Sequence, residues 1–578
     1  MTIRFRPRRA VFLLAACAIL LAASCHPSPN PLDDYRPPHG GDAIVPPVAN
    51  AAPPWPEWVL RPWVWEDEGT RESATALVQG YIDHDIPVGA VIIDSPWETN
   101  YNTFLFDPNL YPDPGGMIEH FHGLGVRVFL WITSVVNLDS PNYIEGFTNG
   151  YYLNNGRTMR WWKGVGSYLD YTNPEAVAWW HGQMDAALGL APDGWKVDMT
   201  DDLLRRWVNV QGYAGTYEVD RYRELYYRDF FNYTRGKLGP DRVITARPVD
   251  AQGKADGRSF APVDACFAGW VGDQKASFAG LRGALTNYRL SSERGYVNFG
   301  SDIGGYIGTG LRDPELLVRW AQLGALSPIM ENGGQGEHRP WMYDTVTRDV
   351  YRTFAKLHAA LLPYLYSEGA RSYAAGVSLM RFLPNGLDHY LLGDSLLVAP
   401  ITESTDQIAV TLPAGTWIDW WTGVEIAGPS GYWMATPIDV YPLFVRRGAI
   451  LPLDLREDTV FADHSGDRPP LTVYVYPEPG SVSTFDVVEE KAGGARIECD
   501  PTDGLTIRLS ATDRQYAFRV GGVAEPRRVE LTRHHDLKRV SARDALVSAG
   551  SGWYYNRDTR ELWIKPGDAT KGMIATVR

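Results

Sequence analysis

The chain has 578 residues, of which 44% are hydrophobic and 21% are charged. This balance is typical of a globular protein and excludes both a disordered chain and a multispan membrane protein. The length suits one large domain with one or two smaller ones. The formal net charge is -14, and no basic run follows the N-terminal residues, so nucleic acid is not an expected partner.

The first 24 residues have the layout of a secretory signal. Four arginines precede an apolar run at residues 10–23, which is shorter than the roughly 20 residues of a membrane-spanning helix. Two outcomes stay open for the segment after this run. Cys25 is lipidated and the Pro-rich residues 25–54 form a tether, or the signal is simply cleaved. Leu14-Ala15-Ala16-Cys17 fits the letters of a lipobox better, but the apolar run before it is very short.

Both outcomes predict an exported protein, either a periplasmic or cell-envelope lipoprotein anchored to the membrane through Cys25, or a secreted one. Loss of the signal takes away four Arg and moves the net charge to about -18. Beyond the signal only Cys25, Cys266 and Cys499 remain. Three cysteines build neither a disulfide framework nor a Cys-based zinc site. We therefore expect no metal and no cofactor.

From residue 58 onward, short β-branched and aromatic runs alternate with helix-like stretches, the pattern of a parallel sheet with crossover helices. One example of a helix start is Asn173-Pro174, which precedes residues 175–188 and places Pro at the first helical position. Eight strands fit a (β/α)8 TIM barrel of about 250 residues. The predicted strands are residues 58–67, 89–97, 126–136, 194–202, 242–249, 264–273, 296–305 and 323–332.

Two segments interrupt the barrel pattern, an insertion at residues 137–172 and a loop at residues 250–263. Long loops in compact domains are usually functional. Residues 345–369 predict a last helix, and short strands broken by Gly and Pro follow it. The predicted fold is α/β, a barrel followed by all-β sandwich domains. The expected units are a signal (1–24), a tether (25–54), the barrel (55–371), a proximal β-sandwich (372–455) and a distal β-domain (456–578).

Acidic residues end several of the predicted strands: Asp94, Asp198, Asp273 and Asp302. A single Asp after a strand usually caps the next helix. Four at the C-terminal mouth of one barrel, where such barrels have their active sites, point to a functional site instead. Arg247 ends strand five and Trp131 strand three. Asp201 and Asp202 lie beyond strand four and are better explained as caps.

Strand alternation favours Asp198 over the nearby Asp201 and Asp202. Lys196 and Asp198 are two positions apart, so both side chains point to the same side of the strand. A nearby Lys favours the ionised carboxylate. A carboxylate pair with aromatic walls and an Arg is the equipment of glycoside hydrolysis. The 21 Trp and 31 Tyr fit this, because sugars stack on aromatic rings, although core packing explains aromatic residues as well.

Several ordered motifs resemble glycoside hydrolase family 31, over about residues 58–455. The resemblance implies that Asp198 is the nucleophile and Asp273 the general acid/base of a retaining α-glycosidase acting through a β-glycosyl intermediate. The motifs are Asp94 followed by Phe106-Asp107-Pro108 and Tyr111-Pro112-Asp113-Pro114, then Val128-Phe129-Leu130-Trp131-Ile132, Trp195-Lys196-Val197-Asp198, Trp270-Val271-Gly272-Asp273, Ser301-Asp302-Ile303-Gly304-Gly305 and Tyr441-Pro442-Leu443-Phe444-Val445-Arg446-Arg447-Gly448.

The resemblance also implies a sugar-binding subsite. Asp94, Arg247 and Asp302 match the positions that bind sugar hydroxyls, with Lys196 beside them. Trp131, Trp270 and Phe299 match the apolar walls, although Trp131 and Phe299 are explained equally well as barrel core. The implied partner is an α-linked oligosaccharide or glycoside.

The chain departs from the family pattern in two places. The predicted barrel begins almost directly after the tether, so we expect no counterpart of the family's large N-terminal β-sandwich. The substrate contact of its loop is then either missing or replaced. Where many members carry Arg-Asn-His after strand eight, this chain has Glu331-Asn332-Gly333, with His338 five residues after Gly333. His338 either replaces the missing His at the substrate or orders the loop.

The expected activity is release of one terminal sugar by double displacement, with α-glucosidase first. The inserted residues 160–174 resemble members that act on α-galactosides or sulfoquinovosides as much as those that act on α-glucosides. An α-galactosidase, an α-xylosidase, a sulfoquinovosidase and a transglycosylase stay open as alternatives. A carbohydrate-binding protein without turnover is the alternative from another class.

Overall fold

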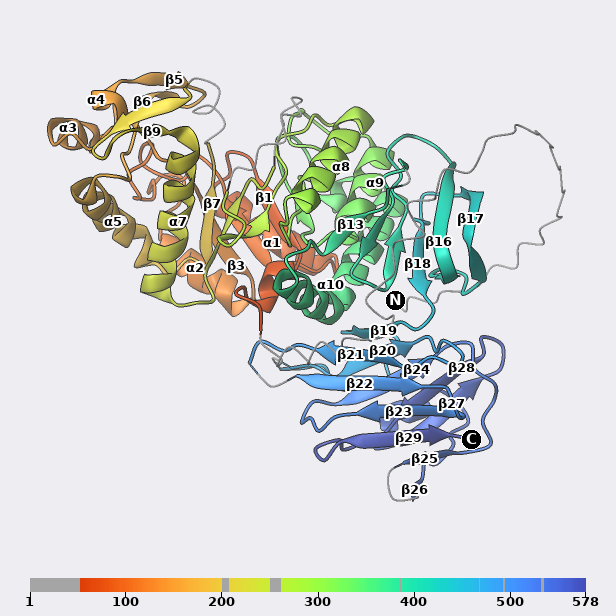
Figure 1. Ribbon diagram of the computed structural model, residues 1–578. Coiled ribbons are helices and arrows are strands. Elements are labelled where there is room, and N and C mark those ends of the chain that lie inside the picture. Colours follow the sequence, from red (N-terminus) through yellow and green to blue (C-terminus); the bar gives the residue numbers. More distant parts are fainter. Residues whose placement is uncertain are drawn as a thin grey trace, which may run out of the picture.

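The computed structural model describes residues 52–199, 207–249, 261–384, 386–466, 468–491, 494–531 and 535–578. The predicted signal, Cys25 with nearly all of the tether, the pair Asp201 and Asp202, and most of the loop 250–263 lie outside this part of the chain. Figure 1 shows a helix-wrapped barrel, coloured red to green, a cyan sheet beside it, and blue sheets below both.

A parallel sheet forms the wall of the barrel, as predicted. Its strand order is β11-β10-β7-β3-β2-β1-β12, and every neighbouring pair is parallel. Most strand residues are buried on both faces, which explains their continuous apolar runs. The strands are β1 (Trp63–Glu66), β2 (Ala90–Ile93), β3 (Arg127–Ile132), β7 (Gly194–Val197), β10 (Val243–Ala246), β11 (Cys266–Gly269) and β12 (Glu331–Asn332).

The predicted seventh strand closes the barrel without becoming a regular strand. The N–H of Val271 donates to the carbonyl of Gly300 at 3.0 Å on one side, and the N–H of Ile303 donates to that of Glu331 at 3.0 Å on the other. The predicted eighth strand was too long. Its first residues end helix α9 (Pro314–Ala325), and only β12 is extended. A short apolar run does not distinguish a buried helix end from a strand.

Helices cover the outside of the barrel, and side chains cap most of their N-termini. The helix predicted after Asn173 is confirmed as α5, and the Asn173 side chain accepts from two backbone N–H groups at its start. Thr70, Asp113, Ser277, Asp313 and Asp344 cap other helices in the same way. Besides α9, the helices are α1 (Arg71–Asp83), α2 (Pro114–Gly123), α5 (Pro174–Leu188), α7 (Val219–Leu238), α8 (Phe278–Glu293) and α10 (Thr345–Ala374); two 3-10 helices are η1 (Glu57–Leu60) and η2 (Pro340–Met342).

The insertion at residues 137–172 folds into a small unit of its own. It contains α3 (Tyr143–Thr148), α4 (Leu153–Gly156) and a sheet of β4 (Val135–Asn137), β6 (Gly164–Tyr168) and β5 (Met159–Trp161). The hairpin of β8 (Asn209–Gly212) and β9 (Gly215–Glu218) packs beside it. The Asp170 carboxylate joins the two, because it accepts from the backbone N–H groups of Thr172 and Tyr213.

The described C-terminal residues after α10 form β-sheets, joined by one short helix, α11 (Ala545–Ser548). A six-stranded sheet, β13-β14-β15-β18-β16-β17, is followed by a five-stranded sheet, β19-β20-β24-β28-β27, and a second six-stranded sheet, β21-β22-β23-β29-β25-β26. The strands are β13 (Met380–Phe382), β14 (Tyr390–Leu392), β15 (Leu396–Val398), β16 (Gln407–Asp419), β17 (Glu425–Ala435), β18 (Leu443–Arg446), β19 (Ile450–Leu453), β20 (Leu471–Val475), β21 (Ser483–Val487), β22 (Ala495–Asp500), β23 (Leu505–Leu509), β24 (Tyr516–Val520), β25 (Val529–Leu531), β26 (His535–Asp536), β27 (Gly552–Asn556), β28 (Glu561–Lys565) and β29 (Met573–Val577).

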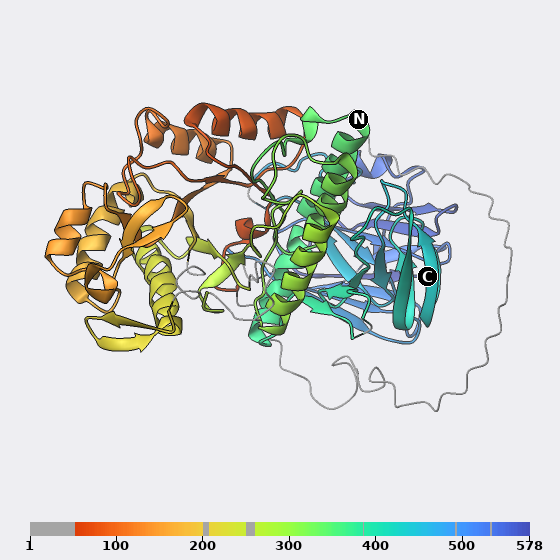
Figure 2. The ribbon, with the colours of Figure 1, turned by 90° about the horizontal axis from the view of Figure 1, so that it is seen from above.

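Helix α10 stands between the barrel and the C-terminal sheets (Figure 1), and Figure 2 shows green helices in this position from above. Three of its residues contact three different parts of the chain. The hydroxyl of Tyr366 donates to the carbonyl of Trp55 before the barrel, and that of Tyr364 to the carbonyl of Leu392 in β14. The hydroxyl oxygen of Ser367 accepts from the N–H of residue 488 after β21.

Most tryptophans pack in the hydrophobic core, so core packing accounts for most of the high aromatic content. Among the tryptophans that the structure describes, only Trp162 and Trp433 are exposed, at 54% and 70%. Within the described ranges, none of the helices combines the length and the apolar character that a bilayer crossing requires.

Candidate active site

The polar residues predicted at the strand ends meet at one mouth of the barrel. Asp94 directly follows β2, Lys196 lies in β7, and Asp198 directly follows that strand. Arg247 directly follows β10, and Asp273 lies four residues beyond β11. The C-terminal ends of parallel strands face the same way. The ends of these strands therefore bring their charged groups into one shared site.

Asp198 is held as a carboxylate by three donors. Its Oδ1 accepts from Arg247 Nε at 3.1 Å and from the N–H of Met199 at 2.7 Å, and its Oδ2 accepts from Trp131 Nε1 at 3.1 Å. Burial opposes ionisation, but Arg247 and then Lys196 outweigh it and lower the pKa of Asp198 below its ordinary value. The direct cationic partner is therefore Arg247, and Lys196, which the sequence suggested, acts from further away.

Arg247 connects Asp198 to Asp273. Its Nη2 donates to both carboxylate oxygens of Asp273, at 3.0 and 2.9 Å, and its guanidinium lies 4.7 Å from the ring centroid of Trp270. The Asp273 side chain is 26% exposed, against 9% for that of Asp198. The two carboxylates thus lie on one guanidinium, with Asp273 nearer the solvent.

Lys196 forms the second ion pair of the site. Its Nζ donates to Asp94 Oδ2 at 2.9 Å and lies 3.5 Å from the ring centroid of Trp65. Burial alone would lower the pKa of Lys196, but Asp94, Asp302 and Glu331 around it raise the pKa instead. Burial also raises the pKa of Asp94, which Lys196 only partly offsets. This ammonium group is the local counter-charge for three carboxyl groups.

Two further carboxyl groups, Asp302 and Glu331, are buried side by side. They are paired across a parallel bridge and are 0% and 1% exposed. In the described part of the chain, none of their four carboxylate oxygens has a hydrogen-bond partner. Burial and mutual repulsion raise the pKa of Asp302 well above its ordinary value, and burial raises that of Glu331. Both carboxyl groups therefore favour the protonated form more than an exposed carboxyl group does, and their oxygens have free capacity for ligand hydroxyl groups.

The packing of Trp65 explains why Gly occupies position 333. A Cβ atom on Gly333 would lie 2.2 to 2.4 Å from three atoms of the Trp65 ring, which is far inside van der Waals contact. Any larger residue at 333 therefore requires Trp65 to move. Sequence reasoning identified neither Trp65 nor Glu331 as a site residue. The only signal was the departure Glu331-Asn332-Gly333 itself.

His338 holds the loop after β12. Its Nδ1 lies 2.9 Å from the carbonyl of Ile303, and its Nε2 lies 2.9 Å from Arg312 Nη2. Burial and then Arg312 lower the pKa of His338 to about 4. A neutral ring that donates from Nδ1 to Ile303 and accepts at Nε2 from Arg312 fits these two contacts. The carbonyl of Gln335, 3.0 Å from Nε2, accepts from Arg312 as well. This geometry fits the loop-ordering alternative for His338.

The three predicted apolar walls differ in their surroundings. Trp131 contacts Asp198 and Trp270 contacts Arg247, so both line the charged site. Phe299 is fully buried and packs on Tyr288 at 5.4 Å between ring centroids. Its place in the hydrophobic core fits the core alternative for this residue.

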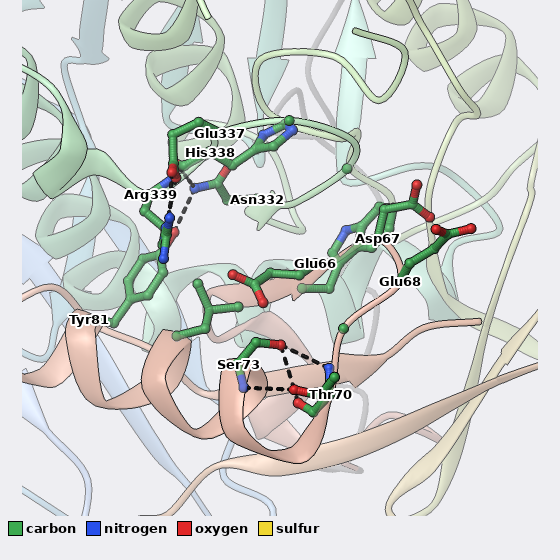
Figure 3. Close-up of a pocket in the computed structure, with 15 residues that line it drawn as sticks. Glu66, Asp67, Glu68, Thr70, Ser73, Tyr81, Asn332, Glu337, His338 and Arg339 are labelled. Carbon is green, nitrogen blue, oxygen red and sulfur yellow. Dashed lines mark hydrogen bonds and ion pairs between the residues drawn. The ribbon is translucent and has the colours of Figure 1, made fainter. Parts of the chain in front are cut away.

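Trp65, which contacts Lys196, also lines a cavity of about 350 Å³ (Figure 3). Asp67 and Glu68, at the end of β1, line it together with Trp65. The hydroxyl of Tyr306 lies 3.4 Å from Asp67 Oδ1, and its ring stacks on Trp65. Asp67 also interacts with Asp94 and Lys196. The cavity is thus an acidic neighbour of the site, which the sequence did not indicate.

Comparisons with known proteins identify relatives of this chain. At 26% identity over 431 residues, the chain is similar to an α-xylosidase of Emericella nidulans, covering 69% of the chain and 54% of that protein. At 25% identity over 594 residues, it is similar to an isomaltosyltransferase of Sporosarcina globispora, covering 89% and 52%. The structure of a cycloalternan-forming enzyme from Listeria monocytogenes has the same fold, with a TM-score of 0.79, 22% identity, and coverage of 91% and 55%.

The chain spans about half the length of the curated relatives it matches. The model of the glycosyl hydrolases family 31 TIM-barrel domain matches residues 52–368, and that of the family 31 C-terminal domain matches residues 383–451. The first match alone covers more than half of the chain. With its barrel, its C-terminal sheet and both family models in agreement, the chain belongs to glycoside hydrolase family 31.

Proposed function

We propose that this protein is an exo-acting retaining α-glycosidase, with Asp198 as the nucleophile and Asp273 as the general acid/base. The observation that carries the proposal is the arrangement around Arg247. An ionised, buried Asp198 and a more exposed Asp273 lie on the same guanidinium. An ionised carboxylate in the pocket and a second carboxyl group towards the leaving group are what double displacement requires.

In the first step the Asp198 carboxylate attacks the anomeric carbon while Asp273 gives a proton to the departing glycosidic oxygen. The product is a covalent β-glycosyl ester. In the second step Asp273 takes a proton from water, which attacks the same carbon and releases the sugar with its α-configuration. Arg247 engages both oxygens of Asp273, so a bound substrate has to loosen this contact before Asp273 can act as an acid.

The charge of the pocket bears on the choice of sugar. Lys196 is paired with Asp94, and Arg247 is paired with Asp198 and Asp273. Asp302 and Glu331 add two more carboxyl groups around Lys196. A sulfonate or carboxylate on the sugar would meet like charges in a buried site, which is costly. The pocket therefore favours neutral sugars over sulfoquinovosides. We place α-glucosidase activity first on the family resemblance, with α-galactosidase and α-xylosidase activity as alternatives.

Transfer of the sugar to another sugar is the second candidate activity. It is favoured by the similarity to an isomaltosyltransferase and to a cycloalternan-forming enzyme, which are named for transfer products. The intermediate on Asp198 serves both reactions, and the acceptor, water or a hydroxyl group, decides between them. We also retain export as a proposal, with Cys25 as the lipidated residue.

A panel of neutral and anionic α-glycosides tests the proposal. Turnover of at least one neutral member is expected, with the α-anomer as the first product in proton NMR. Asp198→Asn should lower kcat by roughly 10⁴ or more, while circular dichroism shows an unchanged fold. A β-anomer appearing first would contradict retention. Binding of sugars without turnover of any of them would favour a carbohydrate-binding protein.

A further inference from the structure

Trp162 lies at the tip of the hairpin between β5 and β6, in the insertion that follows the third barrel strand. Its side chain is 54% exposed, although most tryptophans of this protein are buried. A single exposed apolar side chain needs no explanation by itself. Two other observations distinguish Trp162 from an ordinary surface residue: its connection to the nucleophile and the rigidity of its support.

An unbroken row of aromatic rings connects Trp162 to Asp198. Trp131, which donates to Asp198, lies 6.1 Å from the ring centroid of Tyr101 in an edge-to-face contact. Tyr101 lies 5.3 Å from Trp161, again edge to face, and Trp161 lies 5.2 Å from Trp162. These separations are typical of paired aromatic side chains. The row begins at the reacting group and ends at the surface.

Asn137 fixes the two residues that flank Trp162. Its Oδ1 accepts from Trp161 Nε1 at 2.7 Å, and its Nδ2 donates to the carbonyl of Lys163 at 2.9 Å. Gly164 permits this approach, because a Cβ atom there would lie 2.5 Å from the Asn137 amide nitrogen and its φ is +144°. The exposed ring is thus presented by a backbone that is held on both sides. Such preorganisation lowers the entropy lost on binding.

The hairpin also contacts the segment that follows β1. Lys163 Nζ donates to Glu68 Oε1 at 3.0 Å and interacts with Asp67 and Tyr101. Asp67 and Glu68 line the cavity beside Trp65, and Figure 3 shows both carboxylates on the same side of it. An aromatic face with carboxylates close by offers a sugar both a stacking surface and acceptors for its hydroxyl groups.

We propose that Trp162 is the stacking platform of an acceptor-side subsite, which binds the sugar on the leaving-group side of the cleaved bond. This inference rests on the proposed function, since it defines which side is the leaving-group side. The occupant is a neutral α-linked oligosaccharide of two or more hexoses, because the acids around the cavity disfavour an anionic chain. The same subsite holds the incoming sugar when the reaction is transfer.

The test compares two substrates of the sugar that the panel identifies, its α-glycosyl fluoride and a trisaccharide that ends in it. The fluoride occupies only the pocket, whereas the trisaccharide reaches the hairpin. Trp162→Ala should lower kcat/KM for the trisaccharide about tenfold, as expected for one lost aromatic contact. It should leave kcat/KM for the fluoride within about twofold of the parent protein. Trp162→Phe should restore most of the loss.

Trp433→Ala is the matched control. Trp433 is more exposed than Trp162 and lies on β17, on the far side of the molecule in Figure 1. It should change neither rate. Equal losses on both substrates, or an unchanged rate on the trisaccharide, would overturn the subsite while leaving the proposed function standing.

If the parent protein hydrolyses neither substrate, the proposed function fails, and calorimetric titration with maltotriose and isomaltotriose decides about the platform. Weaker binding by Trp162→Ala would support it. Equal affinity of the variant and the parent, or no binding by either, would overturn it.

Discussion

Replacement of Glu331 by Gln tests the buried carboxyl pair. The substitution keeps the shape of the side chain and removes one charge from a site where Asp302 and Glu331 have no hydrogen-bond partners among the described residues. Burial raises the pKa of Glu331 from 4.5 to about 7. The folded protein therefore binds this proton more tightly than the unfolded chain. The contribution of Glu331 to stability is therefore greatest below pH 4.5, falls as the pH rises through about 7, and stays reduced above it.

The difference between the ordinary pKa of Glu331 and its pKa in the folded protein corresponds to at most about 3 kcal/mol. The free energy of unfolding falls by this amount when Glu331 ionises. Glu331→Gln should therefore raise the free energy of unfolding at pH 8 by about 1 to 3 kcal/mol and change it little at pH 4. Lys196 keeps Asp94 as its partner, so the variant leaves no cation unpaired. The same variant should lower kcat/KM, since a hydroxyl acceptor is lost.

The assay is urea unfolding followed by tryptophan fluorescence at pH 4 and pH 8. Glu119→Gln, at an exposed position of α2, is the control and should show the same stability as the parent protein at both pH values. A Glu331→Gln protein that is less stable than the parent at pH 8 would refute the reasoning, because it would mean that the ionised carboxylate is well paired in the folded state.

Two more substitutions probe the site. Arg247→Met removes the cation that most favours ionisation of Asp198, so the pKa of Asp198 should rise. We expect kcat/KM to fall at least about 100-fold, and to fall more at pH 5 than at pH 7. An equal loss of kcat/KM at both pH values would contradict this role of Arg247. Gly333→Ala places a Cβ within 2.4 Å of the Trp65 ring, so thermal unfolding should show a loss of about 1 to 3 kcal/mol. In the Trp65→Ala background, Gly333→Ala should cost less stability than it does in the parent protein. An equal cost in both backgrounds would argue against the contact.

The charged side chains of the site could largely be predicted from the sequence. Asp94, Asp198 and Arg247 follow apolar strands, and strand alternation places Lys196 beside them. These inferences need only local spacing and the shared direction of parallel strands. The eight-stranded plan was predictable for the same reason, since each strand is a short apolar run.

What the sequence could not provide depends on contacts between distant segments. The collision between Trp65 and a side chain at 333 joins positions more than 260 residues apart, and no local pattern encodes it. The pairing of Asp302 with Glu331 depends on how residues 299–303 close the barrel without forming a regular strand. The end of α9 at Ala325 was mistaken for a strand because apolar runs of this length occur in both.

The contacts of helix α10 have a consequence for how the chain can be divided. Tyr364, Tyr366 and Ser367 lie within one turn of the helix and bond to a strand of the proximal sheet, to the segment before the barrel and to the distal sheets. Removal of the distal sheets would expose one side of α10, whose other sides contact the proximal sheet and the segment before the barrel. We therefore expect the three parts to unfold together, and a shortened catalytic fragment to need a substitute for the surface that it loses.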